Sequence, residues 1–475
     1  MHSLALIPAW LANFAPIAGV LIFLSVGLFI LRRIFGSKLP VTYSWAYRRR
    51  RIMNWLPLGL TYAFLYMGRY NINVAKTVLD PETGLALMTK AELGMITVIG
   101  TTTYALAFLI NGPLADRFGG RKTILAAALG SSFANFGMGW VLDSGYEGSL
   151  VGPFGFLYAI NMYFQSFGAV SIVKVNANWF HVNERGTFGA IFGILISLGL
   201  YFAYDWGGPI AENYGAQWAF YAPTAILLAF AAIDYFLVFD KPSDTGHEDF
   251  DPGDAKLTEE GERLGVVAMA KRMITHPVIL TIILIETCSG FVRGGVMKWG
   301  FIFAKETGQE LLSNNWGLWL CIAGISGGFF AGVISDFVFQ SRRGPSAVIL
   351  YAITTISLAG AAALIASPIA GVLVLFSILS VIGVHGMLSG TASMDFGGRK
   401  NAGLAVGLID GMVYLGFGVQ SIILGFVLPT GEEQTDPANW RIWLLVILPV
   451  AVMGLLLSLR IWNAKPRSKD SVVKS

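Results

Sequence analysis

Long apolar runs separated by short polar segments recur along the whole chain. Each run is close to the ~20 residues that a helix needs to cross ~30 Å of hydrocarbon, with allowance for tilt. The sequence therefore predicts an all-α integral membrane protein with thirteen spans, over residues 14–34, 54–76, 91–112, 122–141, 153–175, 186–206, 218–239, 278–304, 313–335, 346–366, 369–394, 402–428 and 440–462.

The polar segments between the spans alternate in charge. Acidic or mixed segments lie at 77–90, 207–217 and 429–439. Because Lys and Arg favour cytoplasmic loops, the other set is predicted to be cytoplasmic, together with the C-terminus. This basic set comprises residues 48–51, 116–122, 184–185, 271–272, 342–343, 399–400 and 465–469. The expected location is a bacterial cytoplasmic (inner) membrane.

The first apolar run has a charge pattern of its own. It has no basic segment before it, and Arg32, Arg33 and Lys38 lie at its end or just after it. We therefore expect residues 1–40 to form a reversed anchor with its N-terminus outside, not a cleaved signal peptide. Twelve spans remain without it, with both ends in the cytoplasm.

The twelve remaining spans divide into two similar sets of six. In the first, Arg69 is followed 47 residues later by Asp116 of a loop, and in the second Arg293 is followed 43 residues later by Asp336. Two six-helix repeats with a binding site between them are typical of transporters that work by alternating access. The predicted organisation is an anchor at 1–40, bundles at 41–239 and 278–462, an inter-bundle loop at 240–277 and a tail at 463–475.

Composition narrows the class further. The chain is 55% hydrophobic and 13% charged, whereas ordinary soluble domains have about 25% charged residues. The net charge of +4 gives no indication of nucleic-acid binding. Cys288 and Cys321 both lie in apolar segments, with neither a disulfide framework nor metal-ligand spacing.

Two arginines lie within predicted spans, Arg69 in 54–76 and Arg293 in 278–304. A guanidinium in hydrocarbon costs several kcal/mol unless water or an anion meets it, so both are expected to face a wet central cavity. At ~1.5 Å per residue, they lie roughly 20 and 22 Å along their helices from Leu56 and Val278. Two forked cations at matched depth suit a phosphate or carboxylate.

Several motifs resemble the major facilitator superfamily, beginning with DRFGGRK at 116–122. The finer resemblance is to the organophosphate:phosphate antiporters, which carry glycerol-3-phosphate and hexose-6-phosphate. It extends from about Arg48 to Trp462 and leaves out the predicted anchor. The segments that carry it are TYAFLYMGRYNINVA (61–75), MYFQSFGAVSIVKVNANWF (162–180), NERG (183–186), GFVRGGVMKWGFIFAKE (290–306) and GRKNAGLAVGLIDGMVYLG (398–416).

This resemblance implies roles for particular residues. Arg69 and Arg293 match the two arginines that bind the phosphoryl group. Asp116, Arg117 and Arg121 belong to the gating loop. The other implied substrate-binding positions are Tyr62, Tyr66, Tyr104, Gln165, Lys174, Trp299 and Tyr414.

Some of these positions have a second interpretation. Lys174 lies toward the cytoplasmic end of its helix, where it can simply extend toward the headgroups or cap the helix. The tyrosines can equally serve packing. Tyr62 and Tyr66 share the i, i+4, i+7 face with Arg69, which makes them better cavity candidates than Tyr70.

The chain also departs from that family. Ile196 stands where the glycerol-3-phosphate carriers have a histidine, and Phe108 stands where a lysine is expected. AVSIV (169–173) replaces a proline-rich turn. Glu286 occupies a position that tends to be neutral, and Lys298 one that is commonly acidic. Phosphate recognition is therefore expected to persist while the other end of the substrate differs.

Three ionisable residues are candidates for coupling or selectivity: Glu286, Asp410 and His385. Glu286 lies two turns before Arg293 on nearly the same helix face. It can carry a proton, pair with a basic residue such as Lys174, or recognise an amine on the substrate. Lys298 is twelve residues away on the same helix, too far for direct contact. Asp410 and His385 can also be purely structural.

Enzyme motifs such as a Walker A loop or HExxH are absent from the sequence, and no cofactor is expected. The paired repeats favour alternating access over a channel. We expect a monomer in membrane lipid that exchanges a phosphate ester for inorganic phosphate. The alternatives are a proton-coupled carrier of an organic anion or zwitterionic phosphoester, and a sugar-phosphate sensor that does not transport.

Overall fold

Every regular element in the described part of the chain is a helix. The computed structural model describes residues 43–79, 88–181, 185–249, 266–339, 342–389 and 402–464. The predicted anchor at 1–40 and nearly all of the predicted tail at 463–475 lie outside these residues. The prediction of an all-helical membrane protein is confirmed for the part that is described.

The N-terminal half of the molecule, here the N-half, contains six long helical segments. The fifth is broken by a π-helical turn at Phe202–Trp206, which joins α7 to α8. The helices are α3 (Trp45–Val78), α4 (Lys90–Phe118), α5 (Gly120–Asp143), α6 (Val151–Trp179), α7 (Arg185–Tyr201), α8 (Gly207–Tyr214) and α9 (Trp218–Leu237).

The C-terminal half, here the C-half, repeats this plan after the short helix α10 (Val266–Thr275). A second π-helical turn, at Ile334–Val338, ends its second long helix. The helices are α11 (Pro277–Glu306), α12 (Glu310–Ser313), α13 (Trp316–Val333), α14 (Arg343–Ala363), α15 (Ile369–Met387), α17 (Ala402–Val427) and α18 (Arg441–Arg460).

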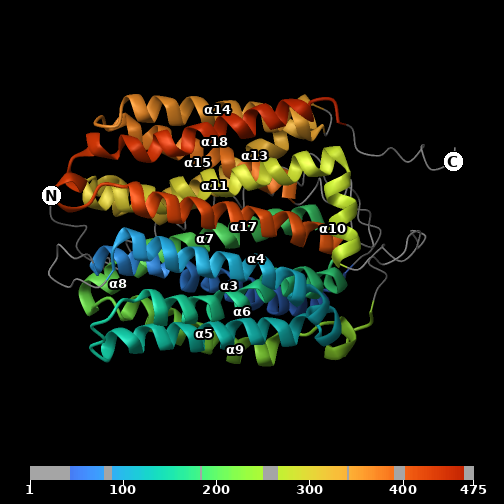
Figure 1. Cartoon of the computed structure of the whole chain (residues 1–475). Coiled ribbons are helices and arrows are strands. Elements are labelled where there is room, and N and C mark those ends of the chain that lie inside the picture. The colour runs from blue at the N-terminus through green and yellow to red at the C-terminus, as the bar shows by residue number, and fades with distance from the viewer. Residues whose placement is uncertain are drawn as a thin grey trace, which may run out of the picture.

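Ten helices in the described residues are long and apolar enough to cross a membrane. The two remaining long segments, α3 and α7–α8, run beside them (Figure 1). Helix α3 carries buried Arg69, Asn71 and Asn73 along its length, which lowers its hydropathy. An ionisable residue such as Arg69 inside a bundle is therefore a candidate for a functional role.

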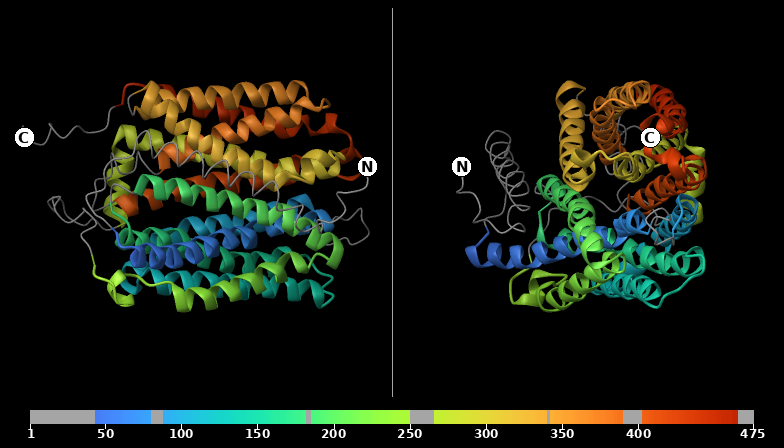
Figure 2. Two further views of the ribbon diagram at one scale, coloured as in Figure 1. Left: turned by 180° about the vertical axis from the view of Figure 1, so that it is seen from behind. Right: turned by 90° about the vertical axis from the view of Figure 1, so that its left-hand side faces the viewer.

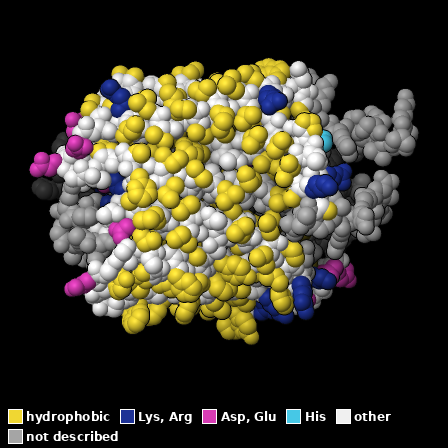
Figure 3. Space-filling model, in the orientation of Figure 1, with side chains coloured by type: hydrophobic (Ala, Val, Ile, Leu, Met, Phe, Trp, Pro, Cys, Tyr) yellow, Lys and Arg dark blue, Asp and Glu magenta, His cyan; other side chains and the backbone are white. Residues whose placement is uncertain are grey.

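The two halves lie side by side with their long helices nearly parallel, and the end-on view separates them clearly (Figure 2). Apolar side chains cover the middle of the face that Figure 3 shows. One end carries α10 and the C-terminal end of α18 and is rich in Lys and Arg; we call it the basic end. The opposite end, the acidic end, carries the loops that follow α5, α8, α11 and α17.

Local sequence explains where several helices begin. Thr89 caps α4 through a reciprocal capping box with Glu92, which satisfies two backbone N–H groups. Pro277 occupies the first position of α11, where its missing N–H is harmless. Gly119 adopts φ 86° between α4 and α5, a conformation that side chains disfavour. These signals fix the tight turns that keep neighbouring helices antiparallel.

The halves meet closely at the acidic end and separate toward the basic end. Where α17 crosses α4, a Cβ added at Gly425 would lie 2.7 Å from the Lys90 carbonyl oxygen. At the other end of the same pair, a Cβ at Gly407 would lie 3.8 Å from the Phe108 Cβ. Helix contact this close needs glycine.

The second pair of helices that joins the halves behaves in the same way. On α13, a Cβ added at Gly317 would lie 2.8 Å from the Tyr201 Cα, whereas one at Gly328 would meet nothing within 4 Å. Both pairs therefore tighten toward the acidic end. The structure has the halves closed at the acidic end and spread at the basic end.

Candidate functional site

Arg69 lies in the second half of α3 and is almost fully buried, with 3% of its surface exposed. Its Nε donates to Gln165 Oε1 at 2.8 Å, and its two terminal nitrogens donate to the hydroxyls of Tyr414 at 2.7 Å and Tyr104 at 3.1 Å. The three acceptors come from α6, α17 and α4. Arg69 thus joins both halves through neutral oxygen atoms.

Helix α6 fixes the backbone beneath Arg69. The Tyr158 hydroxyl donates to the Arg69 carbonyl at 2.9 Å, and Asn161 Nδ2 donates to the Gly68 carbonyl at 2.8 Å. Asn161 also accepts from Gln165 Nε2 at 3.0 Å. Because Gln165 is held in turn, the Arg69 guanidinium has a defined position before any ligand binds.

Aromatic rings surround the same guanidinium. Its carbon lies 4.5 Å from the ring centres of Tyr66 and Tyr104 and 5.8 Å from that of Tyr414. The rings also contact one another: Tyr104 and Tyr414 are 4.3 Å apart, and Tyr62 packs edge-on to Tyr66 at 5.3 Å. Cation–π contacts stabilise the charge without neutralising it.

Arg293 lies on α11 in the other half and is partly buried. In the described residues it makes no hydrogen bond and no ion pair. It lies within electrostatic range of Tyr66, Tyr70, Tyr414 and Glu286. Since Tyr66 and Tyr414 also neighbour Arg69, the two arginines belong to one tyrosine-lined site.

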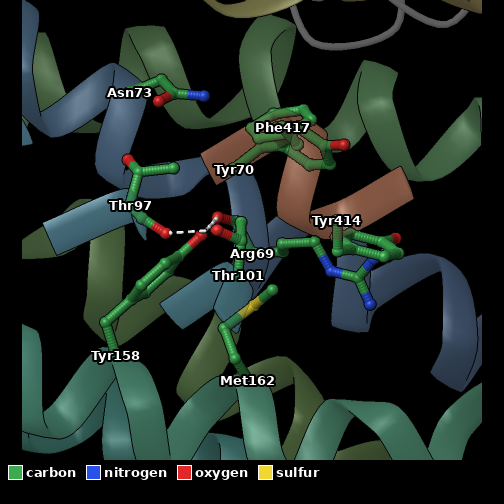
Figure 4. A pocket seen from close by; sticks show the side chains of 9 residues that line it. All are labelled: Arg69, Tyr70, Asn73, Thr97, Thr101, Tyr158, Met162, Tyr414 and Phe417. Atoms are coloured by element: carbon green, nitrogen blue, oxygen red, sulfur yellow. Dashed lines mark hydrogen bonds between the residues drawn. The ribbon is translucent and has the colours of Figure 1, made fainter. Parts of the chain in front are cut away.

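A small pocket opens beside Arg69 on the side that faces the acidic end. Figure 4 shows the Arg69 guanidinium next to Tyr414, with Thr97 and Tyr158 on the opposite side. Its free interior space is about that of one water molecule. A phosphate ester requires the pocket to widen. The lining residues are Arg69, Tyr70, Asn73, Thr97, Thr101, Tyr158, Met162, Tyr414 and Phe417.

The residues suggested for coupling gather on the C-half, next to Arg293. His385 Nδ1 lies 2.9 Å from Glu286 Oε2, and Glu286 is fully buried. Asp410 bonds to Ser389 and lies within electrostatic range of both Arg293 and Glu286. Among the described residues, Glu286 Oε1 and Asp410 Oδ1 are buried and have no hydrogen-bond partner. We call Glu286, His385 and Asp410 the acid cluster.

Two predicted substrate residues lie apart from the pocket lining. Trp299 is fully buried and donates from Nε1 to Gln420 Oε1 at 3.1 Å, so it packs between α11 and α17. Lys174 is partly buried on α6, nine residues beyond Gln165 toward the basic end, which corresponds to about 14 Å along the helix. Neither reaches Arg69 in this conformation.

The small pocket beside Arg69 is lined by Tyr70, and not by Tyr62 or Tyr66, which the helical-face argument favoured. The helical-face argument assumed that the cavity touches a single face of α3. Because the site lies between two halves, it extends around the helix and reaches Tyr70, whose ring also stacks near Tyr66 at 6.0 Å.

The predicted gating loop packs against its own half. The backbone N–H of Arg121 donates to Asp240 Oδ1 at 2.9 Å, and its guanidinium lies 4.5 Å from the Phe239 ring centre. Arg117 is exposed and lies over Phe118. Asp116 lies near the end of α4. The loop therefore ties α4 and α5 to the end of α9.

A buried ion cluster joins the halves at the acidic end. Glu306 of α11 lies 2.6 Å from Lys90 Nζ and 3.7 Å from Lys76 Nζ. Lys90 also donates to Gln434 Oε1 and to the Pro429 carbonyl, both at 2.6 Å. This lysine–glutamate cluster, formed by Lys76, Lys90 and Glu306, closes the acidic end of the interface.

Sequence reasoning missed Tyr158, Asn161 and Thr97, although part of the signal was present. Asn161 and Gln165 are four residues apart and share one face of a predicted span. Polar spacing of this kind inside a span predicts a helix contact or a site. Thr97 gave no signal, because a threonine in a span commonly bonds its own helix, as it does here to the Leu93 carbonyl.

Comparisons with known proteins identify the family of this chain. The Major Facilitator Superfamily profile matches residues 58–421. The glycerol-3-phosphate transporter of Bacillus subtilis is 26% identical over 470 residues, which cover 92% of this chain and 97% of that protein. The membrane sensor protein UhpC of Salmonella typhimurium is 24% identical over 445 residues, covering 91% and 96%.

Solved structures support the fold. A bacterial homolog of the human lysosomal transporter Spinster, solved in an inward-facing and unoccupied conformation, superposes with a TM-score of 0.67 at 15% identity. The match covers 90% of this chain and all of that one. In the part of the chain that the structure describes, no group of three His, Cys, Asp or Glu residues is arranged to hold a metal ion.

Proposed function

Because the chain belongs to the Major Facilitator Superfamily, we propose that it exchanges an organic phosphate ester for inorganic phosphate across the membrane. It is a secondary transporter related to glycerol-3-phosphate and sugar-phosphate carriers, and not an enzyme. Arg69 and Arg293 hold the phosphoryl group between the two halves. The residues of the tyrosine cage, Tyr62, Tyr66, Tyr104 and Tyr414, together with Gln165, position these cations.

The observation that carries the proposal is the environment of Arg69. Its hydrogen-bond acceptors are an amide oxygen and two phenol oxygens, and no carboxylate among the described residues pairs with it. A buried cation without a counter-ion is costly unless a ligand supplies the negative charge. A phosphoryl group does so, and its oxygens match the planar fork of arginine.

The graded contact between the halves supports a mechanism of alternating access. The acidic end is closed by the lysine–glutamate cluster, and the basic end is spread. If the basic end is cytoplasmic, as its Lys and Arg residues favour, this is an inward-facing conformation. Binding of the phosphoryl group draws Arg293 toward Arg69, which closes the basic end before the acidic end opens.

A second candidate function rests on the acid cluster. Glu286 is fully buried, bonds to His385 and has one oxygen without a partner. Buried carboxylates near a substrate arginine are common proton sites in transporters. Under this alternative the protein couples uptake of an organic anion or a zwitterionic phosphoester to protons.

The third candidate, a sensor that binds without transporting, is favoured by the resemblance to a protein named as a membrane sensor. Its sequence similarity extends over nearly the same length as that of the transporters. The fold and the aligned length therefore do not distinguish a transporter from a sensor that does not transport.

Phosphate counterflow in proteoliposomes tests the three candidates. Vesicles loaded with phosphate are exposed to labelled phosphate, with glycerol 3-phosphate or glucose 6-phosphate as competitor. We expect exchange without any proton gradient. Uptake that requires a gradient would identify the proton-coupled carrier. Saturable binding to the purified protein without flux would identify the sensor.

A further inference from the structure

Lys298 is a buried cation that the proposed exchange does not use. It lies on α11, five residues after Arg293, with 1% of its surface exposed. Its Nζ donates to Thr97 Oγ1 on α4 at 2.7 Å and lies 4.7 Å from the ring centre of Trp299. Lys298 therefore reaches across the interface between the two halves.

No carboxylate within the described residues neutralises Lys298. Glu306 follows it by eight residues on α11 and is already paired with Lys90 and Lys76 at the acidic end. Glu286 precedes it by twelve residues and bonds to His385. An ammonium has three N–H donors, and one of them is used, by the Thr97 hydroxyl. A buried ammonium with neutral neighbours is unfavourable unless an anion joins it.

The position of Lys298 relative to the pocket indicates where that anion comes from. Thr97, the residue that Lys298 contacts, lines the pocket that also contains Arg69. On α4, Thr97 precedes Tyr104, the hydroxyl partner of Arg69, by seven residues. Seven residues correspond to about 10 Å along a helix. Lys298 and Arg69 thus bond to opposite ends of one stretch of α4, with the pocket between them.

We propose that Lys298 forms a second anion subsite, which receives a carboxylate or a second phosphoryl group at the far end of the substrate. This inference rests on the proposed function, because it assumes that Arg69 and Arg293 hold the first phosphoryl group. The preferred substrate class is then a phosphorylated carboxylic acid or a bisphosphate. When the pocket widens, the free N–H groups of Lys298 reach the ligand past Thr97.

The competing explanation is that Lys298 is an uncharged spacer that only packs between α4 and α11. This explanation predicts no preference for a second anionic group. It also predicts that Lys298→Met, which keeps the length of the side chain, changes no substrate ranking. The two explanations therefore differ in selectivity and not only in stability.

A matched pair of competitors provides the test. Glycerol 3-phosphate and 3-phosphoglycerate differ in that a hydroxymethyl group is replaced by a carboxylate. Inhibition of labelled-phosphate counterflow is measured for both with the wild-type protein. We expect 3-phosphoglycerate to inhibit at roughly tenfold lower concentration, because a hydrogen bond to a charged group is worth more than a neutral one. Equal inhibition by the two compounds would overturn the proposal without any variant.

Variants then assign the preference to Lys298. Lys298→Met is expected to remove at least most of the tenfold preference, and Lys298→Arg to retain part of it. Lys271→Met is the matched control, because Lys271 is exposed on α10. An unchanged preference in Lys298→Met would overturn the assignment. Loss of inhibition by both compounds in Arg69→Lys is expected; normal inhibition there would instead contradict the proposed phosphoryl site.

Discussion

Arg69 and Arg293 occupy corresponding helices of the two halves, yet their surroundings differ. Arg69 on α3 has three hydrogen-bond partners, which come from three different helices. Arg293 on α11 has no hydrogen bond in the described residues, and its neighbours include the acid cluster. Hydrogen bonds from the described residues hold Arg69, whereas none holds Arg293.

From this difference we infer that the two halves have different roles in binding the ligand. A guanidinium held by neutral oxygens keeps its charge for the ligand and loses little entropy on binding. A guanidinium next to carboxylates exchanges partners when the ligand arrives, so its contribution depends on their charge. We therefore expect the N-half to supply a fixed anchor for the phosphoryl group, and the C-half to supply the arginine that responds to substrate.

Arginine-to-lysine substitutions test the comparison with the largest expected effect. Arg69→Lys and Arg293→Lys keep the charge but lose the fork, and we expect exchange to fall about 100-fold or more in each. Only Arg69→Lys is expected to lower the melting temperature clearly, because only Arg69 has several hydrogen bonds to lose. Counterflow and thermal unfolding are measured on the same preparations.

The matched control for this pair is Arg272→Lys on the exposed face of α10, which is expected to leave both readouts unchanged. Equal losses of stability in the Arg69 and Arg293 variants would contradict the fixed and mobile roles. Normal phosphate exchange in either variant would show that the phosphoryl site lies elsewhere.

A variant that opens the acidic end tests whether the different surroundings of Arg69 and Arg293 depend on the conformation of the protein. In Glu306→Gln, Lys76 and Lys90 lose their buried carboxylate, and removing one partner of a buried pair costs about 3–5 kcal/mol. We expect the population to shift toward states that are open at this end. A cysteine introduced at Thr77 should then react faster with a polar maleimide.

Glu310→Gln serves as the control for that experiment, because Glu310 is an exposed acid at the same end. If labelling at position 77 is equally slow in Glu306→Gln and in the parent protein, the ion cluster does not hold this end closed.

Glu286→Gln tests the contribution of the acid cluster in the C-half. The amide keeps the shape of the side chain and its contact with His385, but it cannot take up a proton. If the acid cluster tunes Arg293, the pH dependence of uptake flattens or the ranking of zwitterionic and anionic phosphoesters changes several-fold. His385→Asn is measured in parallel, since it removes the imidazole and leaves the carboxylate.

An unchanged pH profile and an unchanged ranking in both variants, together with lower thermal stability, would leave the cluster with a structural role only. That result would also remove the proton-coupled alternative.

The smallest expected effect concerns the contact between the halves at Tyr414. Tyr414→Phe removes one hydrogen bond to Arg69 and keeps the aromatic ring, which corresponds to about 1 kcal/mol or a fivefold weaker phosphate affinity. Trp299→Phe is the control, because Trp299 bonds to Gln420 away from the pocket. Binding of labelled phosphate is measured for both. A larger loss in Trp299→Phe would place the ligand on the other side of α11.

The sequence by itself determined the class of protein, the long apolar helices of the described residues and the presence of an arginine within two of the predicted spans. The bilayer sets the length and the apolar composition of each spanning helix, and it makes a lone cation within a span costly. These constraints act on each segment separately. Spacing along α11 likewise showed that Lys298 and Glu286 do not touch, and their partners are in fact Thr97 and His385. The properties of a single helix are sufficient for these predictions.

Only the tertiary structure decided which residues meet across helices. Nothing local distinguishes Tyr70, which lines the pocket, from Tyr62, which does not, or indicates that Trp299 turns toward Gln420. These outcomes depend on the rotation of each helix about its axis, and that rotation is set by packing against neighbours that are far away in sequence. The hydrogen bonds that hold Arg69 go to Gln165, Tyr104 and Tyr414, which lie on three different helices.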